Sequence, residues 1–146
     1  MAITSAICNS FKQEILEAEH NFTASTGNTF DIALYTSSAT LGASTTAYSS
    51  SNEITNSSGT AYTAGGKALT SVTPTLESST AVCDFADVSW TSASFTANGC
   101  LIYNDSHATD AAVCAVAFGG DKTVSSGTFT VQFPAAGATT AIVRIA

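Results

Sequence analysis

The sequence predicts a mainly β protein: an antiparallel β-sandwich of the jelly-roll or immunoglobulin-like type, preceded by one N-terminal amphipathic helix. Short segments of alternating apolar and polar residues recur from Phe30 to the C-terminus, and turn residues separate them. A four-residue apolar period near the N-terminus predicts the helix. With 146 residues, the chain is expected to form a single domain over 1–146.

The predicted strands follow from side chains that alternate with period two. Phe30, Ile32 and Leu34 define a strand at 30–35, and a second clear case is 127–133. The remaining strands are predicted at 67–73, 80–90, 93–104, 111–118 and 140–145, with turns at 104–106, 119–121 and 134–137. The strand at 111–118 is apolar on both faces, which places it centrally in a sheet or at a subunit interface.

The helix is predicted over 1–20. Its apolar stripe repeats every four residues and consists of Ile3, Ile7, Phe11 and Ile15. Thr4 or Ser5 is the expected N-cap, and His20 is expected to cap the C-terminal end. The stripe must pack on the sheet, on a neighbouring subunit or on a larger assembly, so these four residues are the predicted interface.

A long loop or arm is predicted over 36–66. This segment loses periodicity and is rich in Ser and Thr. Loops of this length are uncommon in a compact domain unless they have a function. We expect it to fold over a neighbour or to present a binding surface.

Composition restricts the partners. The net charge is −7, and the basic residues are few and scattered: Lys12, Lys67, Lys122 and Arg144. Nucleic acid needs a cationic surface, so it is not an expected partner. No apolar stretch approaches the roughly 20 residues of a membrane span, and no export signal is recognised, so no membrane partner is expected. Synthesis in a cytoplasm is expected instead.

The cysteines show no metal-binding spacing. Cys8, Cys83, Cys100 and Cys114 lack any CxxC pair and are expected to be free thiols, with a Cys83–Cys100 or Cys100–Cys114 disulfide as the alternative.

No catalytic, cofactor or metal site is predicted. The acid pair Asp84 and Asp87 points to opposite strand faces unless a bulge intervenes. The segment around His107 is interpreted first as a turn and only second as a cation site. It contains four possible ligands, Asn104, Asp105, His107 and Asp110. The aromatic residues are interpreted first as half-buried strand residues rather than as a carbohydrate groove; they are Trp90, Tyr35, Tyr48, Tyr62 and Tyr103.

Five segments stand out as a signature: TSAICNSFKQE at 4–14, IALYTSSATLG at 32–42, YTAGG at 62–66, FTVQFPAA at 129–136 and AIVRI at 141–145. Together they resemble small structural proteins of tailed bacteriophages, especially aquatic ones. The resemblance spans nearly the whole chain and carries no catalytic residues. It implies a structural role in the virion, with assembly in the host cytoplasm.

Three functions follow as hypotheses. The leading one is a non-enzymatic capsid decoration, or cement, protein, a homo-oligomer favoured as a trimer that binds the major capsid protein or other virion proteins. The alternative is a tail fibre, adhesin or baseplate-associated protein that binds host-surface glycans. The third is a small polysaccharide hydrolase that uses two of the acids Asp84, Asp87, Asp105 and Asp110.

Overall fold

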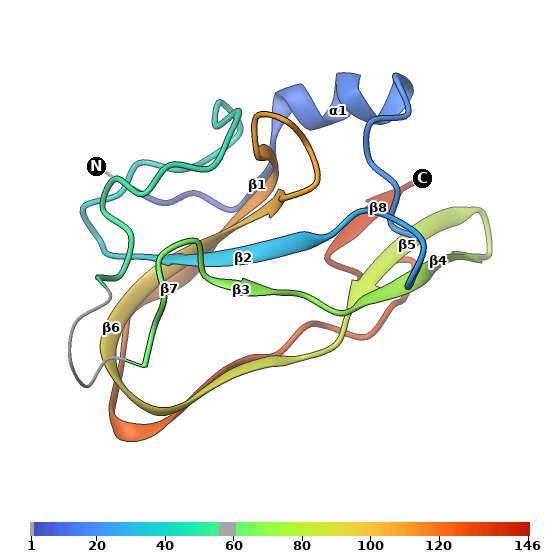
Figure 1. Cartoon of the computed structure of the whole chain (residues 1–146). Coiled ribbons are helices and arrows are strands. Elements are labelled where there is room, and N and C mark those ends of the chain that lie inside the picture. The colour runs from blue at the N-terminus through green and yellow to red at the C-terminus, as the bar shows by residue number, and fades with distance from the viewer. Residues whose placement is uncertain (1, 56–60) are drawn as a thin grey trace.

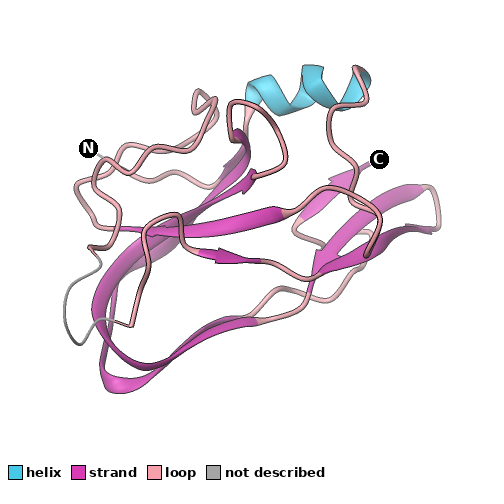
Figure 2. Ribbon diagram, viewed as in Figure 1, coloured by secondary structure: helices cyan, strands magenta, loops and turns pink. Residues whose placement is uncertain are grey.

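The computed structural model describes residues 2–55 and 61–146 and shows antiparallel sheets arranged as a β-sandwich with one short helix (Figures 1 and 2). The predicted mainly β architecture is confirmed. The elements are β1 (Ala6–Ile7), α1 (Asn9–Leu16), β2 (Phe30–Tyr35), β3 (Lys67–Ala68), β4 (Ser71–Glu77), β5 (Thr80–Phe85), β6 (Val88–Asn104), β7 (Ala111–Val131) and β8 (Val143–Ile145). One sheet has the order β1-β7-β6-β2-β3, and the other has the order β4-β5-β8.

A long bent hairpin formed by β6 and β7 belongs to the five-stranded sheet and also contributes to the second layer, because it folds back beneath β2. Its ladder runs from Val88 opposite Val131 to Asn104 opposite Ala111. Figure 1 shows the hairpin curving, so that the part near residues 88–97 and 122–131 lies beneath β2. The predicted strands 93–104, 111–118 and 127–133 are therefore parts of two continuous strands, and the predicted strand 80–90 is divided between β5 and β6.

The bend lies at a bulge. Between the pairs Gly99–Ala117 and Ala97–Lys122, β6 has the single residue Asn98, whereas β7 has the four residues 118–121. Gly119 and Gly120 have φ values of 73° and 128°, which favour glycine. The turn predicted at 119–121 is wrong, because these glycines bend a strand that stays paired instead of ending it.

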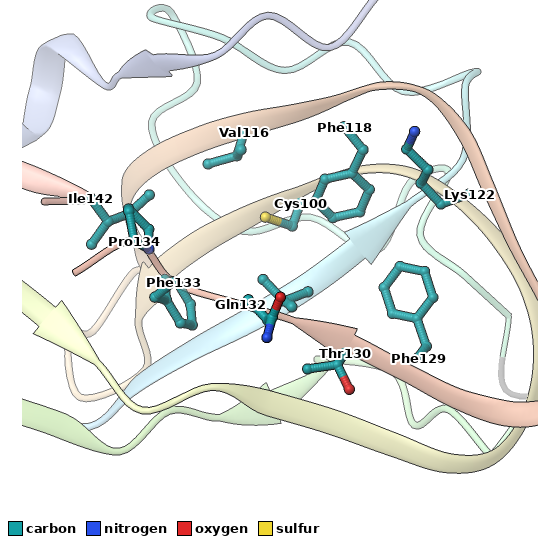
Figure 3. A pocket seen from close by; sticks show the side chains of 11 residues that line it. Cys100, Val116, Phe118, Lys122, Phe129, Thr130, Gln132, Phe133, Pro134 and Ile142 are labelled. Carbon is teal, nitrogen blue, oxygen red and sulfur yellow. The ribbon is translucent and has the colours of Figure 1, made fainter. Parts of the chain in front are cut away.

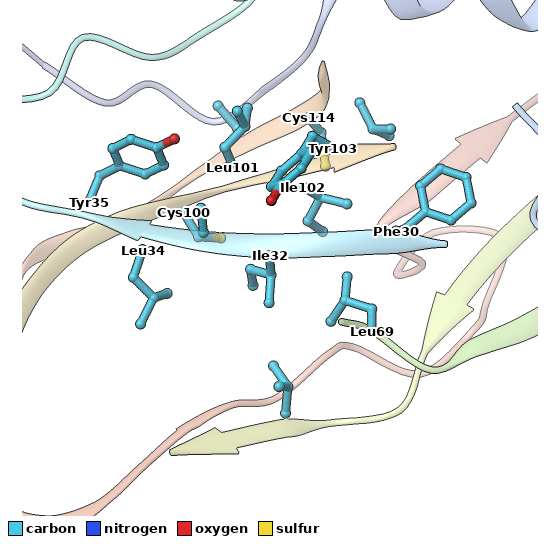
Figure 4. Packing of buried hydrophobic residues seen from close by; sticks show 14 of the residues in the cluster. Phe30, Ile32, Leu34, Tyr35, Leu69, Cys100, Leu101, Ile102, Tyr103 and Cys114 are labelled. Carbon is cyan, nitrogen blue, oxygen red and sulfur yellow. The ribbon is translucent and has the colours of Figure 1, made fainter. Parts of the chain in front are cut away.

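The centre of the five-stranded sheet, at β2 and the end of β6, is buried on both faces. Figure 4 shows Ile32 and Leu34 on one side of β2, and Leu101 and Tyr103 on the other. All four side chains are buried. This arrangement explains the apolar pattern of 111–118, because that part of β7 lies within the sheet between β1 and β6.

The N-terminal helix is shorter than predicted. Residues 1–20 do not form one helix, because Ile3 bridges Leu41 and β1 pairs with β7 before α1 begins. The edge of β7 offers unpaired backbone groups at this point, and strand pairing replaces the helical turn. The N-cap is Cys8 without a side-chain cap bond, so the prediction of Thr4 or Ser5 is also wrong.

The segment 36–66 contains no named strand in its described part, 36–55 and 61–66; residues 56–60 lie outside the described residues. It folds over its own sheet instead of extending away from it. The Ile54 amide donates to the Leu34 carbonyl at 2.9 Å, and the Tyr48 amide donates to the Asp110 carbonyl at 2.9 Å. Ile54 and Tyr62 are buried there.

A buried carboxylate holds this segment in place. Glu53 accepts hydrogen bonds from the Tyr48 hydroxyl at 2.7 Å, the Tyr62 hydroxyl at 2.7 Å and the Gly65 amide at 2.8 Å. The Tyr62 hydroxyl in turn accepts the Leu34 amide at 2.8 Å, which ties the network to β2. Burial is the main cause that raises the pKa of Tyr48 to about 12, and it also raises the pKa of Tyr62, so both hydroxyls remain donors.

We expect Glu53→Ala to lower the free energy of unfolding by roughly 3 kcal/mol, because two hydroxyls and one amide lose a charged acceptor in a buried site. Urea denaturation at pH 7 measures the change. Glu77→Ala, at the exposed end of β4, is the control and should stay within about 0.5 kcal/mol of wild type. Equal stability of both variants would contradict the structural role of Glu53.

Candidate functional site

An apolar groove lies between α1 and β8, and we call it the helix–strand groove. Its cavity volume is about 320 Å³, and it is lined by Ile7, Phe11, Lys12, Ile15, Leu16, Val143, Arg144 and Ile145. Three of the four predicted interface residues line it: Ile7, Phe11 and Ile15. The fourth, Ile3, is buried elsewhere, next to Gly99.

Sequence reasoning missed the other residues of this groove. Leu16 and Ile145 are its most exposed apolar side chains, at 87% and 56%. Leu16 lay beside the predicted stripe, but nothing in the sequence indicated that β8 would lie next to it. Only the packing of the two chain ends brings these residues together.

Two cations line the same groove. The Lys12 ammonium donates to Asn9 Oδ1 at 3.1 Å, and Arg144 Nη1 donates to the Ala138 carbonyl at 3.1 Å. Neither side chain forms an ion pair in the described part of the chain, where the ion pairs join histidines to glutamates. The groove is thus apolar and locally positive in a chain of net charge −7.

A second groove lies where the two halves of β7 face each other, and we call it the sandwich-edge groove. Figure 3 shows Val116 and Phe118 on one half, Phe129 on the other half and Phe133 just beyond its end, with Cys100 between them. Its cavity volume is about 600 Å³. Among the named strands, β7 pairs with β1 at residues 114–115 and otherwise with β6.

The predicted acid pair serves the backbone. Asp84 Oδ1 accepts the amide of Phe85 at 2.8 Å, and Asp87 Oδ1 accepts the amide of Phe133 at 2.9 Å. Asp87 therefore anchors the segment that follows β7. Both carboxylates have a structural partner in this geometry.

The turn at 104–110 ties the hairpin end to the N-terminal region. Asn104 is buried and donates to His20 Nδ1 at 3.1 Å, while His107 Nε2 lies 2.5 Å from Glu19 Oε2. Among the described residues, no group of three or more His, Cys, Asp or Glu side chains is arranged to hold a metal ion. These side chains join two parts of the fold.

His20 does not cap the helix. Its ring lies 4.9 Å from that of Phe11, and its Nε2 lies 2.8 Å from Glu14 Oε2. The prediction of a cap at the C-terminal end is therefore wrong, because α1 has already ended at Leu16 and the chain folds back over it.

The aromatic residues weighed as a carbohydrate groove are mostly buried. Tyr35, Tyr62, Tyr103 and Trp90 are each less than 5% exposed. The Tyr103 hydroxyl donates to the Gly65 carbonyl at 2.7 Å, and the Tyr35 hydroxyl donates to the Ser49 carbonyl at 2.7 Å. These rings support the core and the described part of the 36–66 segment, and they are buried more deeply than the half-buried strand positions that the sequence predicted.

All four cysteines are free, which confirms the first of the two sequence interpretations. Cys100 stands opposite Val116 and Cys114 stands opposite Ile102, so these two cysteines are not cross-strand partners. Burial raises the pKa of Cys83 to about 11 and that of Cys100 to about 12, so the thiols stay protonated and poorly nucleophilic at neutral pH.

Asp31 is a carboxylate that sequence reasoning did not single out. Its Oδ1 atom is buried without a hydrogen-bond partner. Burial, with smaller contributions from Asp105 and Asp110, raises its pKa from 3.8 to about 6. The sequence feature that could have identified Asp31 is its position as the one charged residue of the strand FDIALY at 30–35.

Comparison with protein-family models, with curated proteins and with solved structures finds no match to this chain. In the part of the chain that the structure describes, no helix has the length and apolar character needed to cross a membrane.

We expect Asp31→Asn to stabilise the protein at neutral pH. Because the folded-state pKa of Asp31 is raised to about 6, folding favours the protonated side chain. The resulting stability is fully present below pH 3.8, the unfolded-state pKa, and is lost as the pH rises through about 6. The substitution removes this loss, which we place at roughly 1 kcal/mol after allowing for partial exposure.

Urea denaturation at pH 4 and pH 8 measures the effect of Asp31→Asn. The stabilisation should be present at pH 8 and absent at pH 4, while Glu77→Gln on exposed β4 should show neither change. A gain of the same size at both pH values would contradict the assignment to Asp31 ionisation.

Proposed function

We propose that the chain is a non-enzymatic structural protein of a bacteriophage virion, in which it decorates and stabilises the capsid. The observation that supports this proposal best is the presence of two separate apolar grooves on one small domain. The helix–strand groove has α1 and β8 as its walls, and the sandwich-edge groove has the two halves of β7. Their residue sets do not overlap.

A protein that clamps neighbouring capsid subunits needs more than one contact surface. Each groove exposes apolar side chains that gain free energy when a partner covers them, at about 25 cal/mol per Å² of apolar surface. A partner that binds only the folded protein also stabilises it by mass action. The resemblance of the sequence to tailed-phage structural proteins supports the same proposal.

The proposal includes a homo-oligomer, with a trimer favoured, bound to the major capsid protein. Native mass spectrometry of the purified protein tests the oligomer: a trimer is expected, and a monomer at micromolar concentration would contradict it.

The tail-adhesin alternative has less support. It relied on exposed aromatic side chains that stack on sugar rings, and Trp90 and three of the four tyrosines are buried. The hydrolase alternative also has less support, because Asp84 and Asp87 each accept a backbone amide.

The proposal is tested on phage particles that lack this protein. Purified protein is added back, its copy number is compared with that of the major capsid protein by quantitative mass spectrometry, and the temperature of genome release is measured. We expect a ratio near one, or a simple fraction of it, and a higher release temperature.

Single substitutions connect this result to the grooves. Leu16→Asp in the helix–strand groove and Phe118→Asp in the sandwich-edge groove should each weaken capsid binding by about tenfold or more, since a charge replaces a buried contact. Leu76→Asp, on β4 outside both grooves, is the matched control. Urea denaturation checks that each variant is folded.

A handful of copies per particle, or full binding without any rise in release temperature, would overturn the decoration proposal. Full binding by folded Leu16→Asp and Phe118→Asp would overturn the assignment of the grooves as contact surfaces.

A further inference from the structure

The helix–strand groove has an open strand edge as one of its walls. β8 is the edge strand of the β4-β5-β8 sheet and pairs with β5 alone. Its outer edge therefore offers backbone donors and acceptors with no strand partner among the described residues. Figure 1 shows β8 beneath α1, so the helix forms the opposite wall.

The walls and the floor of the groove suit an extended chain. Phe11 and Val143 are buried at its base, while Leu16 and Ile145 extend along it with large exposed fractions. A strand that pairs with an exposed edge gains main-chain hydrogen bonds, and its alternate side chains enter the adjoining apolar surface. A groove between an edge strand and a helix provides both features.

The positive charges that line the groove favour a binding partner with acidic side chains. Lys12 and Arg144 are two of only four basic residues in the chain, and both line this groove without an acidic partner in the described structure. A carboxylate on the incoming segment would neutralise them. A second copy seated groove to groove would instead bring the same cations together.

We propose that the helix–strand groove binds an extended, apolar segment of a partner protein that carries carboxylate side chains, and that this segment adds to β8 as a further strand. The inference deepens the proposed function, on which it rests for the location of the partner in the virion. It names the chemistry of the contact: apolar side chains against α1, carboxylates against Lys12 and Arg144, and backbone pairing with Val143–Ile145.

The probe is a fluorescein-labelled synthetic peptide of alternating valine and glutamate, and its binding is followed by fluorescence anisotropy at low salt. We expect binding that weakens as salt is added. A peptide of alternating valine and lysine should bind at least about tenfold more weakly, which corresponds to about 1.4 kcal/mol. Equal binding of the two peptides would overturn the role of the cations.

Matched variants locate the site. Lys12→Ser combined with Arg144→Ser should weaken binding of the valine–glutamate peptide by about tenfold, and Leu16→Asp should abolish it. Lys122→Ser removes a cation outside the groove, and Leu76→Asp adds a charge outside it; both should bind like wild type. Since Leu16 is 87% exposed, its substitution leaves the core intact.

Strand addition has its own test. The same valine–glutamate peptide with N-methylated backbone amides keeps every side chain but loses main-chain donors, so it should fail to bind. Amide hydrogen exchange at residues 143–145 should slow when the unmodified peptide binds. Binding of the methylated peptide at full strength would overturn the strand model, and so would unchanged exchange.

Failure of the proposal can be distinguished from failure of the proposed function. Lack of any binding of the valine–glutamate peptide by folded protein overturns the groove proposal, even if the protein decorates capsids. Groove-dependent peptide binding by a protein that neither binds nor stabilises particles supports the groove proposal and overturns the decoration function.

Discussion

The continuous pairing of β6 with β7 through a bend is the constraint on which the rest of the structure depends. Because residues 118–121 bulge opposite Asn98 while the ladder continues, one hairpin contributes to both layers of the sandwich. The side chains of β2 are then covered by the returning half of the same hairpin. The bend also creates the sandwich-edge groove, since it turns Phe118 and Phe129 toward each other across an open side (Figure 3).

Residues 36–55 contribute to the cover of the other face of the five-stranded sheet, where Tyr48 stacks on Tyr103 and Ser49 accepts the Tyr35 hydroxyl. This segment is attached by single backbone hydrogen bonds, such as that from the Ile54 amide to the Leu34 carbonyl, and by side chains. Glu53 supplies that attachment by accepting from two tyrosine hydroxyls and one amide at a buried position. The tyrosines used in this way are withdrawn from the surface, which is why the aromatic content of the chain does not produce an exposed sugar-binding face.

The helix–strand groove exists because strand pairing competes with helix formation near the N-terminus. The apolar period of four would suit a helix across its whole length, but the edge of β7 takes Ala6 and Ile7 as a strand and leaves only Asn9–Leu16 helical. The shortened helix then packs beside β8, close to the other end of the chain. A stripe expected on one helix becomes a groove with a helix and a strand edge as its walls.

The sequence alone determined the mainly β class, the first strand at 30–35, the general positions of the other strands and the free thiols, because these follow from local periodicity and composition. It also singled out Ile7, Phe11 and Ile15, three residues of the helix–strand groove. Only the tertiary structure decided that Gly119 and Gly120 bend a strand instead of ending it, that Glu53 is buried, and that Arg144 and Ile145 lie beside α1. Each of these outcomes depends on contacts between residues far apart in the chain, and side-chain spacing carries no information about such contacts.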